Sequence, residues 1–164
     1  QEQIEVKLTD FNFSLRLDQG ITRYGGGTQY YHSPEKYVKD NDEVIAVASD
    51  IWAVGCILYC FIINKMITPV YHYTIKNSDY MKQMADLPKK KQRDEFRQLR
   101  KDALINKQAE IVTFVHKRVR KQTQFTEEQR QFFHNVLGGC FMSNPKERIS
   151  VEELIRLFQT KKLN

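Results

Sequence analysis

Cysteine, proline and glycine are scarce in this sequence of 164 residues, which has three, four and seven of them respectively. An odd count of three cysteines does not fit the disulfide framework of a small secreted domain. So little proline and glycine excludes a collagen-like repeat and a Pro/Gly-rich disordered chain. The longest apolar run, residues 51–63, is shorter than the roughly 20 residues that span a membrane. We therefore expect one globular domain in a reducing intracellular compartment, cytoplasmic or nuclear.

The net charge of +6 is concentrated in one segment. Residues 88–121 contain twelve Lys/Arg and four Asp/Glu, a charge of +8, which leaves −2 for the rest of the chain. This segment suggests an acidic partner, and the alternative is a helical insert whose charges are simply solvated. The segment has few aromatic residues, Phe96 and Phe114, so single-stranded nucleic acid is not the expected partner.

The N-terminal part combines a predicted strand with a long loop. Ile4, Val6 and Leu8 alternate with polar residues, which is the pattern of a half-buried strand. Residues 14–33 show no periodicity and include three consecutive glycines at 25–27. Because loops of this length inside compact domains usually carry function, we expect a functional loop here.

One helix is expected to form the centre of the core. Residues 50–64 are apolar on every side of a helix, with Ser49 or Asp50 as the N-cap. The Thr-Pro step that follows is predicted to end this helix, and residues 70–88 are predicted to be irregular.

The remainder of the chain is predicted to be helical. Apolar residues recur at helical spacing within the basic insert, about 88–121, and predict two amphipathic helices there. Thr126 and Ser150 each begin a capping box, which places a helix start directly after each of them. The last two helices are therefore expected at 126–140 and 151–159.

Four short motifs stand in order along the chain. Residues 10–12 read Asp-Phe-Asn, 27–35 read Gly-Thr-Gln-Tyr-Tyr-His-Ser-Pro-Glu, 49–56 read Ser-Asp-Ile-Trp-Ala-Val-Gly-Cys, and 144–150 read Asn-Pro-Lys-Glu-Arg-Ile-Ser. In this order and spacing they resemble the second half of a eukaryotic-type protein kinase domain, the helical C-lobe of the serine/threonine type. The resemblance covers nearly all of residues 1–164.

This resemblance implies a mainly α fold. The chain would be a C-lobe fragment with one short N-terminal strand or hairpin, a long activation loop, and a helical bundle around a buried central helix. The activation segment would run over residues 10–35 and the central helix over 50–64.

The first motif implies a metal ligand. By resemblance, Asp10 would hold the Mg²⁺ that bridges the phosphates of ATP, since this hard cation takes carboxylate oxygens. Phe11 would pack inward, in a hydrophobic column between the two lobes. Asn12 stands where the family has glycine and tolerates positive φ less well, so we expect it to restrict movement of this loop.

The second motif implies the rest of the activation segment. Thr28 would contact the aspartate and lysine of the catalytic loop, which favours the serine/threonine type. Ser14, Thr22 and Tyr24 are the candidates for activation-loop phosphorylation, because a phosphate there could pair with arginines and order the loop. The alternative is that these three residues stay unmodified.

The last two motifs imply structural roles. Glu35 and Arg148 would form a buried ion pair that ties the activation segment to the turn before the last helix. Asp50 would anchor the backbone of the catalytic loop besides capping a helix. Trp52 would belong to the most buried helix, packed by the helices at 126–140 and 151–159.

Several kinase motifs are absent from the 164 residues. We find no Gly-rich phosphate loop, no Val-Ala-x-Lys strand and no His-Arg-Asp catalytic loop. We therefore assign no catalytic residue within the chain, and we expect the chain alone to bind ATP and Mg²⁺ weakly and to transfer no phosphate. The complete domain would move the γ-phosphoryl group of Mg-ATP to a protein Ser or Thr, with the N-lobe and a protein substrate as partners.

Other functions stay open at this point. The chain could be a pseudokinase-like scaffold that binds protein partners through its C-lobe and basic insert. A weaker alternative is a surface that binds nucleic acid or membranes through residues 88–121, where the basic residues concentrate.

Overall fold

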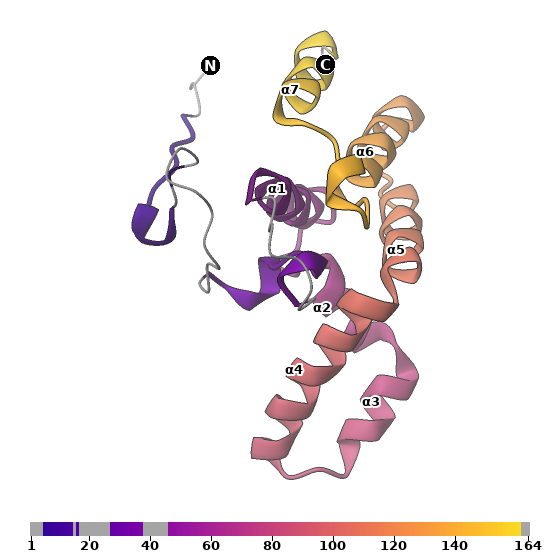
Figure 1. Ribbon diagram of the computed structural model, residues 1–164. Coiled ribbons are helices and arrows are strands. Elements are labelled where there is room, and N and C mark those ends of the chain that lie inside the picture. Colours follow the sequence, from indigo (N-terminus) through magenta and orange to yellow (C-terminus); the bar gives the residue numbers. More distant parts are fainter. Residues whose placement is uncertain (1–4, 15, 17–26, 38–45, 162–164) are drawn as a thin grey trace.

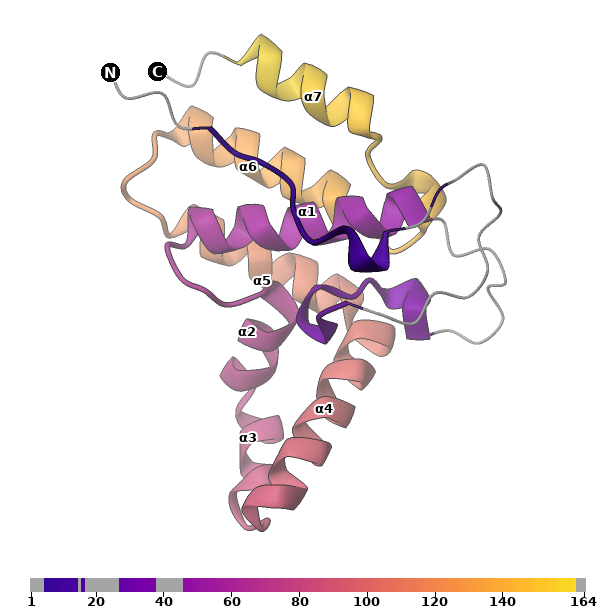
Figure 2. The ribbon, with the colours of Figure 1, turned by 90° about the vertical axis from the view of Figure 1, so that its left-hand side faces the viewer.

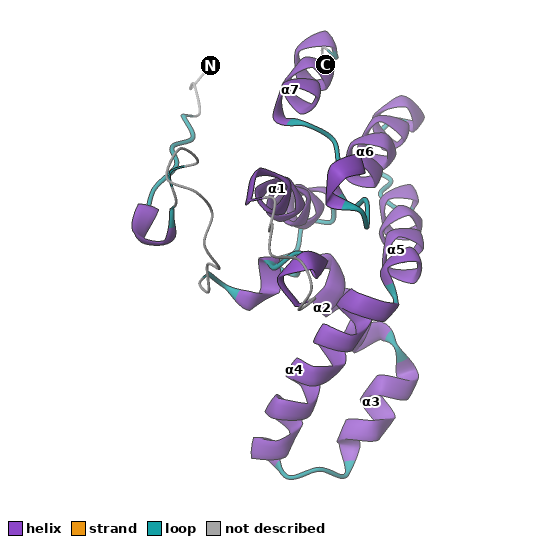
Figure 3. Ribbon diagram, viewed as in Figure 1, coloured by secondary structure: helices purple, strands orange, loops and turns teal. Residues whose placement is uncertain are grey.

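The computed structural model describes residues 5–14, 16, 27–37 and 46–161, and the regular structure in this part of the chain is helical (Figure 1). Figure 3 shows helices joined by loops, and no strand among the described residues. A mainly α fold is what the sequence predicts. The elements are η1 (Phe11–Phe13), η3 (Gln29–Tyr31), η4 (Pro34–Tyr37), α1 (Ala46–Ile62), α2 (Pro69–Lys76), α3 (Ser78–Ala85), α4 (Lys89–Asn106), α5 (Gln108–Arg120), α6 (Glu127–Cys140), η5 (Pro145–Glu147) and α7 (Val151–Thr160).

The predicted N-terminal strand is not formed in the described residues. Residues 5–10 have no regular secondary structure, and Val6 and Leu8 are 87% and 86% exposed. A strand needs a neighbouring strand to satisfy its backbone hydrogen bonds, and the described residues supply none. The alternating pattern therefore favours a strand, but the described residues contain no neighbouring strand with which it could pair.

Helix α1 is the centre of the bundle, and it begins at Ala46 rather than at the predicted residue 50. Ser49 and Asp50 consequently lie inside the helix and do not cap it. Trp52, Cys56 and Tyr59 follow each other at helical spacing and are at most 1% exposed, so one face of α1 forms the middle of the core.

The opposite face of α1 is not covered by the described residues. Ile57 and Phe61 are 46% and 76% exposed, although the sequence predicts a helix buried on every side. The apolar composition of α1 therefore exceeds what the described helices bury.

Helices α6 and α7 cover α1 on one side (Figure 2). Ile51 of α1, Val136 of α6 and Leu154 of α7 belong to one apolar cluster. The rings of Trp52 and Phe141 meet edge to face at 5.0 Å between centroids. Both helix starts predicted from capping boxes are present, because α6 and α7 begin directly after Thr126 and Ser150 with both bonds of each box formed.

The prediction of an irregular segment over 70–88 is wrong, because α2 and α3 occupy most of it. Pro69 is the first residue of α2, where a proline loses no backbone hydrogen bond. Asn77 then begins α3 by accepting hydrogen bonds from the backbone N–H groups of Asp79 and Tyr80. The Thr-Pro step therefore opens a helix, besides following the end of α1.

The basic segment forms the two helices that its apolar spacing predicts. Helix α4 extends beside α3 away from the bundle, and α5 turns back to pack on α6 (Figure 1). Ile111, Val115 and Val119 of α5 are fully buried, whereas α4 buries only Ala103 and Leu104 near its C-terminal end. No helix in the described ranges is long and apolar enough to cross a membrane.

Candidate functional site

The second motif, residues 27–35, lies against the first turns of α1. Its short helices η3 and η4 bring Ser33 and Glu35 into the interior, where they are 0% and 4% exposed. The hydroxyl of Ser33 is 2.7 Å from that of Ser49 in α1, and this hydrogen bond is buried. The motif is therefore fixed to the central helix by polar contacts as well as by packing.

Glu35 and Arg148 form a buried ion pair across 113 positions of sequence. Nη1 of Arg148 donates to Oε1 of Glu35 at 2.7 Å and Nη2 donates to Oε2 at 3.1 Å. The side chains of Arg148 and Glu35 are 0% and 2% exposed, respectively. This two-bond geometry uses the planar fork of arginine, which satisfies both charges away from water.

The remaining donors of Arg148 are also used. Nη1 donates to the carbonyl of Ala48 in α1 at 2.6 Å, and Nε and Nη2 donate to the carbonyl of Met142 at 3.2 and 3.0 Å. The guanidinium carbon lies 5.3 Å from the centre of the Trp52 ring. Arg148 thus joins three of the four motifs, those at 27–35, 49–56 and 144–150.

The first motif lies apart from these three. Asp10 adopts a left-handed backbone conformation, with φ 61°, and the side chain of Asn12 donates to its Oδ1 at 2.8 Å. The residue with positive φ in this motif is thus Asp10 and not Asn12, which stands where the family has glycine. Among the described residues no group of three or more His, Cys, Asp and Glu could hold a metal ion.

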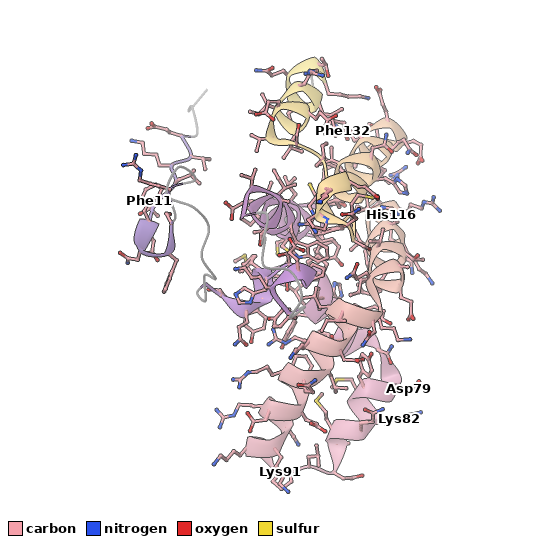
Figure 4. The ribbon with its side chains drawn as sticks, in the orientation of Figure 1. Phe11, Asp79, Lys82, Lys91, His116 and Phe132 are labelled. Atoms are coloured by element: carbon pink, nitrogen blue, oxygen red, sulfur yellow. The ribbon has the colours of Figure 1, made fainter. Side chains whose placement is uncertain are left out.

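Phe11 is 65% exposed, and the hydrophobic column that the resemblance implies for it would need residues of the N-lobe, which these 164 residues do not contain. Figure 4 shows its segment beside the bundle, with Phe11 labelled away from the helices. The neighbouring Phe13 is 59% exposed. An aromatic ring packs inward only against an apolar surface, and the described residues offer none at this position.

The other residues of the activation segment are exposed or lie outside the described residues. Thr28 is exposed and lines a hollow of about 330 Å³ together with Tyr30, Met66 and Tyr71 among others. Ser14 is exposed and ends η1, its backbone N–H donating to the carbonyl of Phe11. Thr22 and Tyr24, the other two candidate phosphorylation sites, lie outside the described residues.

Asp50 is exposed near the beginning of α1, next to the buried Ser49. Partial desolvation raises the pKa of its carboxyl, and the charge of Lys36 opposes that shift. A carboxylate stripped of part of its water accepts strong hydrogen bonds from backbone N–H groups. The position suits the anchoring role that the resemblance implies.

The sequence reasoning missed a group of residues on α4. Tyr30 and Tyr71 meet Arg97 and Arg100 around a cavity of about 450 Å³. The signal was present, since Lys89, Arg93, Arg97 and Arg100 recur every three or four positions and so share one face of α4. The net charge of the segment does not reveal this stripe, because it counts the charges without their positions on the helix.

Comparisons with known proteins agree with the motifs. A family model described as protein kinase domain matches residues 1–157. Over 92% of its length the chain is 26% identical to the dual specificity protein kinase TTK of Mus musculus and 27% identical to Ttk of Danio rerio. Over 35% of its length it is 39% identical to the serine/threonine-protein kinase RUNKEL of Arabidopsis thaliana.

The chain spans only a small part of these relatives, 15%, 13% and 4% of their lengths. No solved structure matches it. The family model nevertheless covers nearly the whole chain, and three of the four motifs that carry the resemblance meet around Arg148 in the structure. On this evidence the chain belongs to the protein kinase domain family.

Proposed function

We propose that the protein is a serine/threonine kinase and that this chain supplies the helical lobe of its catalytic domain. The reaction would transfer the γ-phosphoryl group of ATP to the hydroxyl oxygen of a protein Ser or Thr, releasing ADP and a proton. The observation that carries the proposal is the buried pair of Glu35 and Arg148. It fixes the end of the segment 27–35 beside α1, and a kinase needs such a fixed segment for positioning its reactants.

Each site residue receives a role under this proposal. In the complete domain Asp10 would give its carboxylate to Mg²⁺. The magnesium ion neutralises developing charge on the phosphates when it is bound. Thr28 would position the catalytic loop, and phosphorylation of Ser14, Thr22 or Tyr24 would order the activation segment.

The chain lacks the lysine that binds ATP and the aspartate that accepts the substrate proton, so the test needs a larger protein. The chain joined to its upstream sequence should phosphorylate a mixed protein substrate with labelled ATP and Mg²⁺. Phosphoamino acid analysis should find phosphoserine or phosphothreonine. The 164-residue chain alone should be inactive. A folded joined protein without transfer, or one that labels only tyrosine, would contradict the proposal.

The second candidate is a non-catalytic scaffold, and Asn12 favours it. Its amide already donates to Oδ1 of Asp10, one of the oxygens that a metal ion would need. In this case the C-lobe and the basic residues of 88–121 would bind protein partners instead of supporting catalysis. A joined protein that is folded, binds no Mg-ATP and still captures an acidic protein would favour the scaffold.

A further inference from the structure

Three hollows with shared lining residues lie between Thr28 and helix α4. Three adjoining hollows of about 330, 450 and 540 Å³ share Tyr30 and Tyr71 as lining residues. The first includes Thr28, and the other two include Arg97 and Arg100. We call these joined hollows the cationic groove.

The floor of the groove is a built cluster of rings around Arg100. The guanidinium carbon of Arg100 lies 4.3 Å from the centre of the Tyr30 ring and 5.7 Å from that of Phe96. Tyr71 contacts Tyr30 and Phe96 edge to face, at 5.5 and 5.2 Å between centroids. Arg100 is therefore held in place by its neighbours and does not sample many rotamers.

Arg100 lacks a full set of acceptors. Its Nε is buried and has no hydrogen-bond partner in the described part of the chain. Burial also lowers the pKa of Arg100, because the charged form has lost water there. A negatively charged group placed in the groove would compensate this desolvation.

The wall of the groove on α4 is strongly positive. Lys89, Arg93, Arg97 and Lys101 line it besides Arg100. The acidic residue in the lining, Asp94, lies 3.7 Å from Arg97, and both side chains are more than 60% exposed. Such an exposed pair contributes less than about 1 kcal/mol, so an incoming carboxylate can displace it.

The shape of the groove favours a peptide over nucleic acid. Arg100 covers one face of Tyr30, and Tyr71 and Phe96 contact each other edge to face. Single-stranded nucleic acid binds by stacking bases on open ring faces, which this arrangement restricts. A peptide whose hydroxyl lies near Thr28 would instead lay its neighbouring residues along the groove at about 3.3–3.6 Å per residue.

We propose that the cationic groove binds acidic side chains of the protein substrate and thereby selects Ser/Thr sites flanked by Glu or Asp. This inference rests on the proposed function for the role of Thr28. The groove itself is defined by its contacts and charges, so its ligand class can be tested by binding alone.

The binding test uses the whole protein that carries this chain and two labelled peptides. Both contain one Ser, followed in one by a run of Glu and in the other by a run of Gln. Fluorescence anisotropy should show tighter binding of the Glu peptide, with an advantage that shrinks as salt is added. Arg97→Gln should weaken that binding about fivefold, the equivalent of one exposed charge contact.

Two further variants sharpen the test. Lys82→Gln removes the same charge from α3, at the exposed position labelled in Figure 4, and should leave the affinity unchanged. Asp94→Asn removes the acidic residue of the groove and frees Arg97, so it should tighten binding about twofold. Thermal denaturation of each variant checks that the fold is intact.

Phosphorylation of the same two peptides separates this inference from the proposed function. Faster phosphorylation of the Glu peptide, with the difference reduced by Arg97→Gln, supports both. Transfer to both peptides at equal rates, with equal affinities, overturns the groove assignment and leaves the kinase intact. Absence of transfer with the predicted order of affinities contradicts the kinase and supports the groove. Tighter binding of a single-stranded oligonucleotide than of the Glu peptide also overturns the assignment.

Discussion

At the scale of single residues, Arg148 determines how the motifs meet. Its guanidinium makes two bonds to Glu35 and further bonds to the carbonyls of Ala48 and Met142. All these contacts are removed from water, so neither partner can be lost without leaving the other desolvated. Three of the four motifs are therefore coupled through one side chain.

Removing the guanidinium should destabilise the fold strongly. Arg148→Met leaves the carboxylate of Glu35 buried without its partner, so we expect the free energy of unfolding to fall by about 3–5 kcal/mol in urea titrations. The matched control is Lys161→Met, which breaks the surface pair with the exposed Glu128 and should cost less than about 1 kcal/mol. Equal losses for the two variants would contradict this reading of the buried pair.

Two desolvated histidines should make stability depend on pH. Burial lowers the pKa of His72 and of His116 to about 4, with nearby positive charges adding to the effect. Between the ordinary pKa of about 6.5 and 4, the unfolded chain binds protons that the native chain does not. Stability should therefore be greatest above pH 6.5 and fall as the pH drops towards 4.

Urea titrations from pH 7.5 to 4.5 measure that fall, which we expect to reach up to about 3 kcal/mol for each histidine. His72 is 5% exposed, and its Nδ1 lies 2.8 Å from the hydroxyl of Tyr59. His72→Gln keeps a polar partner for Tyr59 and should remove about half of the pH dependence. An unchanged slope in this variant would exclude His72 as a cause.

At the scale of elements, the contact of α1 with α6 depends on a small residue. A Cβ atom at Gly55 would lie 2.7 Å from Cβ of Cys140 and 2.9 Å from the ring of Phe141. The backbones approach closely only because Gly55 has no side chain. This contact brings the Trp52 ring of α1 against Phe141. The same ring lies against the guanidinium of Arg148, so the contact also positions α1 next to the ion pair.

Gly55→Ala should consequently destabilise the protein by about 1–3 kcal/mol through overpacking. Gly138→Ala is the matched control, because its Cβ would meet its nearest neighbour, Nε2 of His116, at an ordinary 3.6 Å. Alanine favours the helix by up to about 1 kcal/mol over glycine, so this variant should be neutral or stabilising. Thermal denaturation should show a lower melting temperature for Gly55→Ala and an equal or higher one for Gly138→Ala.

The sequence predicted elements well where the signal is local. The capping boxes at Thr126 and Ser150 place α6 and α7 correctly, because a cap depends on residues three positions apart. The sequence does not predict α2 and α3, because their aromatic residues follow no clear helical period. Pro69 is also ambiguous, since a proline can follow the end of one helix or begin the next. The predicted N-terminal strand is not formed in the described residues, because a strand needs a neighbouring strand and local sequence does not encode that neighbour.

The candidate site shows the same difference between features that local sequence predicts and features that depend on the fold. Pairing of Glu35 with Arg148 could be expected from motifs, because both belong to patterns with fixed spacing. The groove on α4 could not, since it joins Tyr30, Tyr71 and Arg100 from three separate elements. The place of Phe11 in a column between two lobes stays a prediction, because these 164 residues do not contain the N-lobe.

At the scale of the whole molecule, the described residues leave apolar surface uncovered. Ile57, Phe61 and Met66 are 46%, 76% and 94% exposed, and they line one shallow hollow of about 280 Å³. Phe11 and Phe13 add further exposed rings. Contiguous apolar surface of this kind drives association in water.

The 164-residue chain should therefore self-associate. Sedimentation velocity should show the average mass rising with protein concentration. The pair of changes Ile57→Gln and Phe61→Gln should reduce that rise, whereas Val151→Gln, on α7 and outside the lining of this hollow, should not. A chain that stays monomeric at every concentration, or associates equally in all variants, would contradict this expectation.

The most direct measurement of the kinase proposal compares two carboxylates in the chain joined to its upstream sequence. Asp10→Asn removes the proposed magnesium ligand, and Asp79→Asn makes the same change at an exposed position on α3, labelled in Figure 4. Transfer of the γ-phosphoryl group from Mg-ATP to Ser/Thr should fall at least about a hundredfold in the first variant, since the metal loses its charged ligand. Asp79→Asn should keep the wild-type rate. Equal rates in the two variants, with both proteins folded, would contradict the assignment of Asp10 as the magnesium ligand, and absence of transfer in the folded unaltered protein would contradict the proposed reaction.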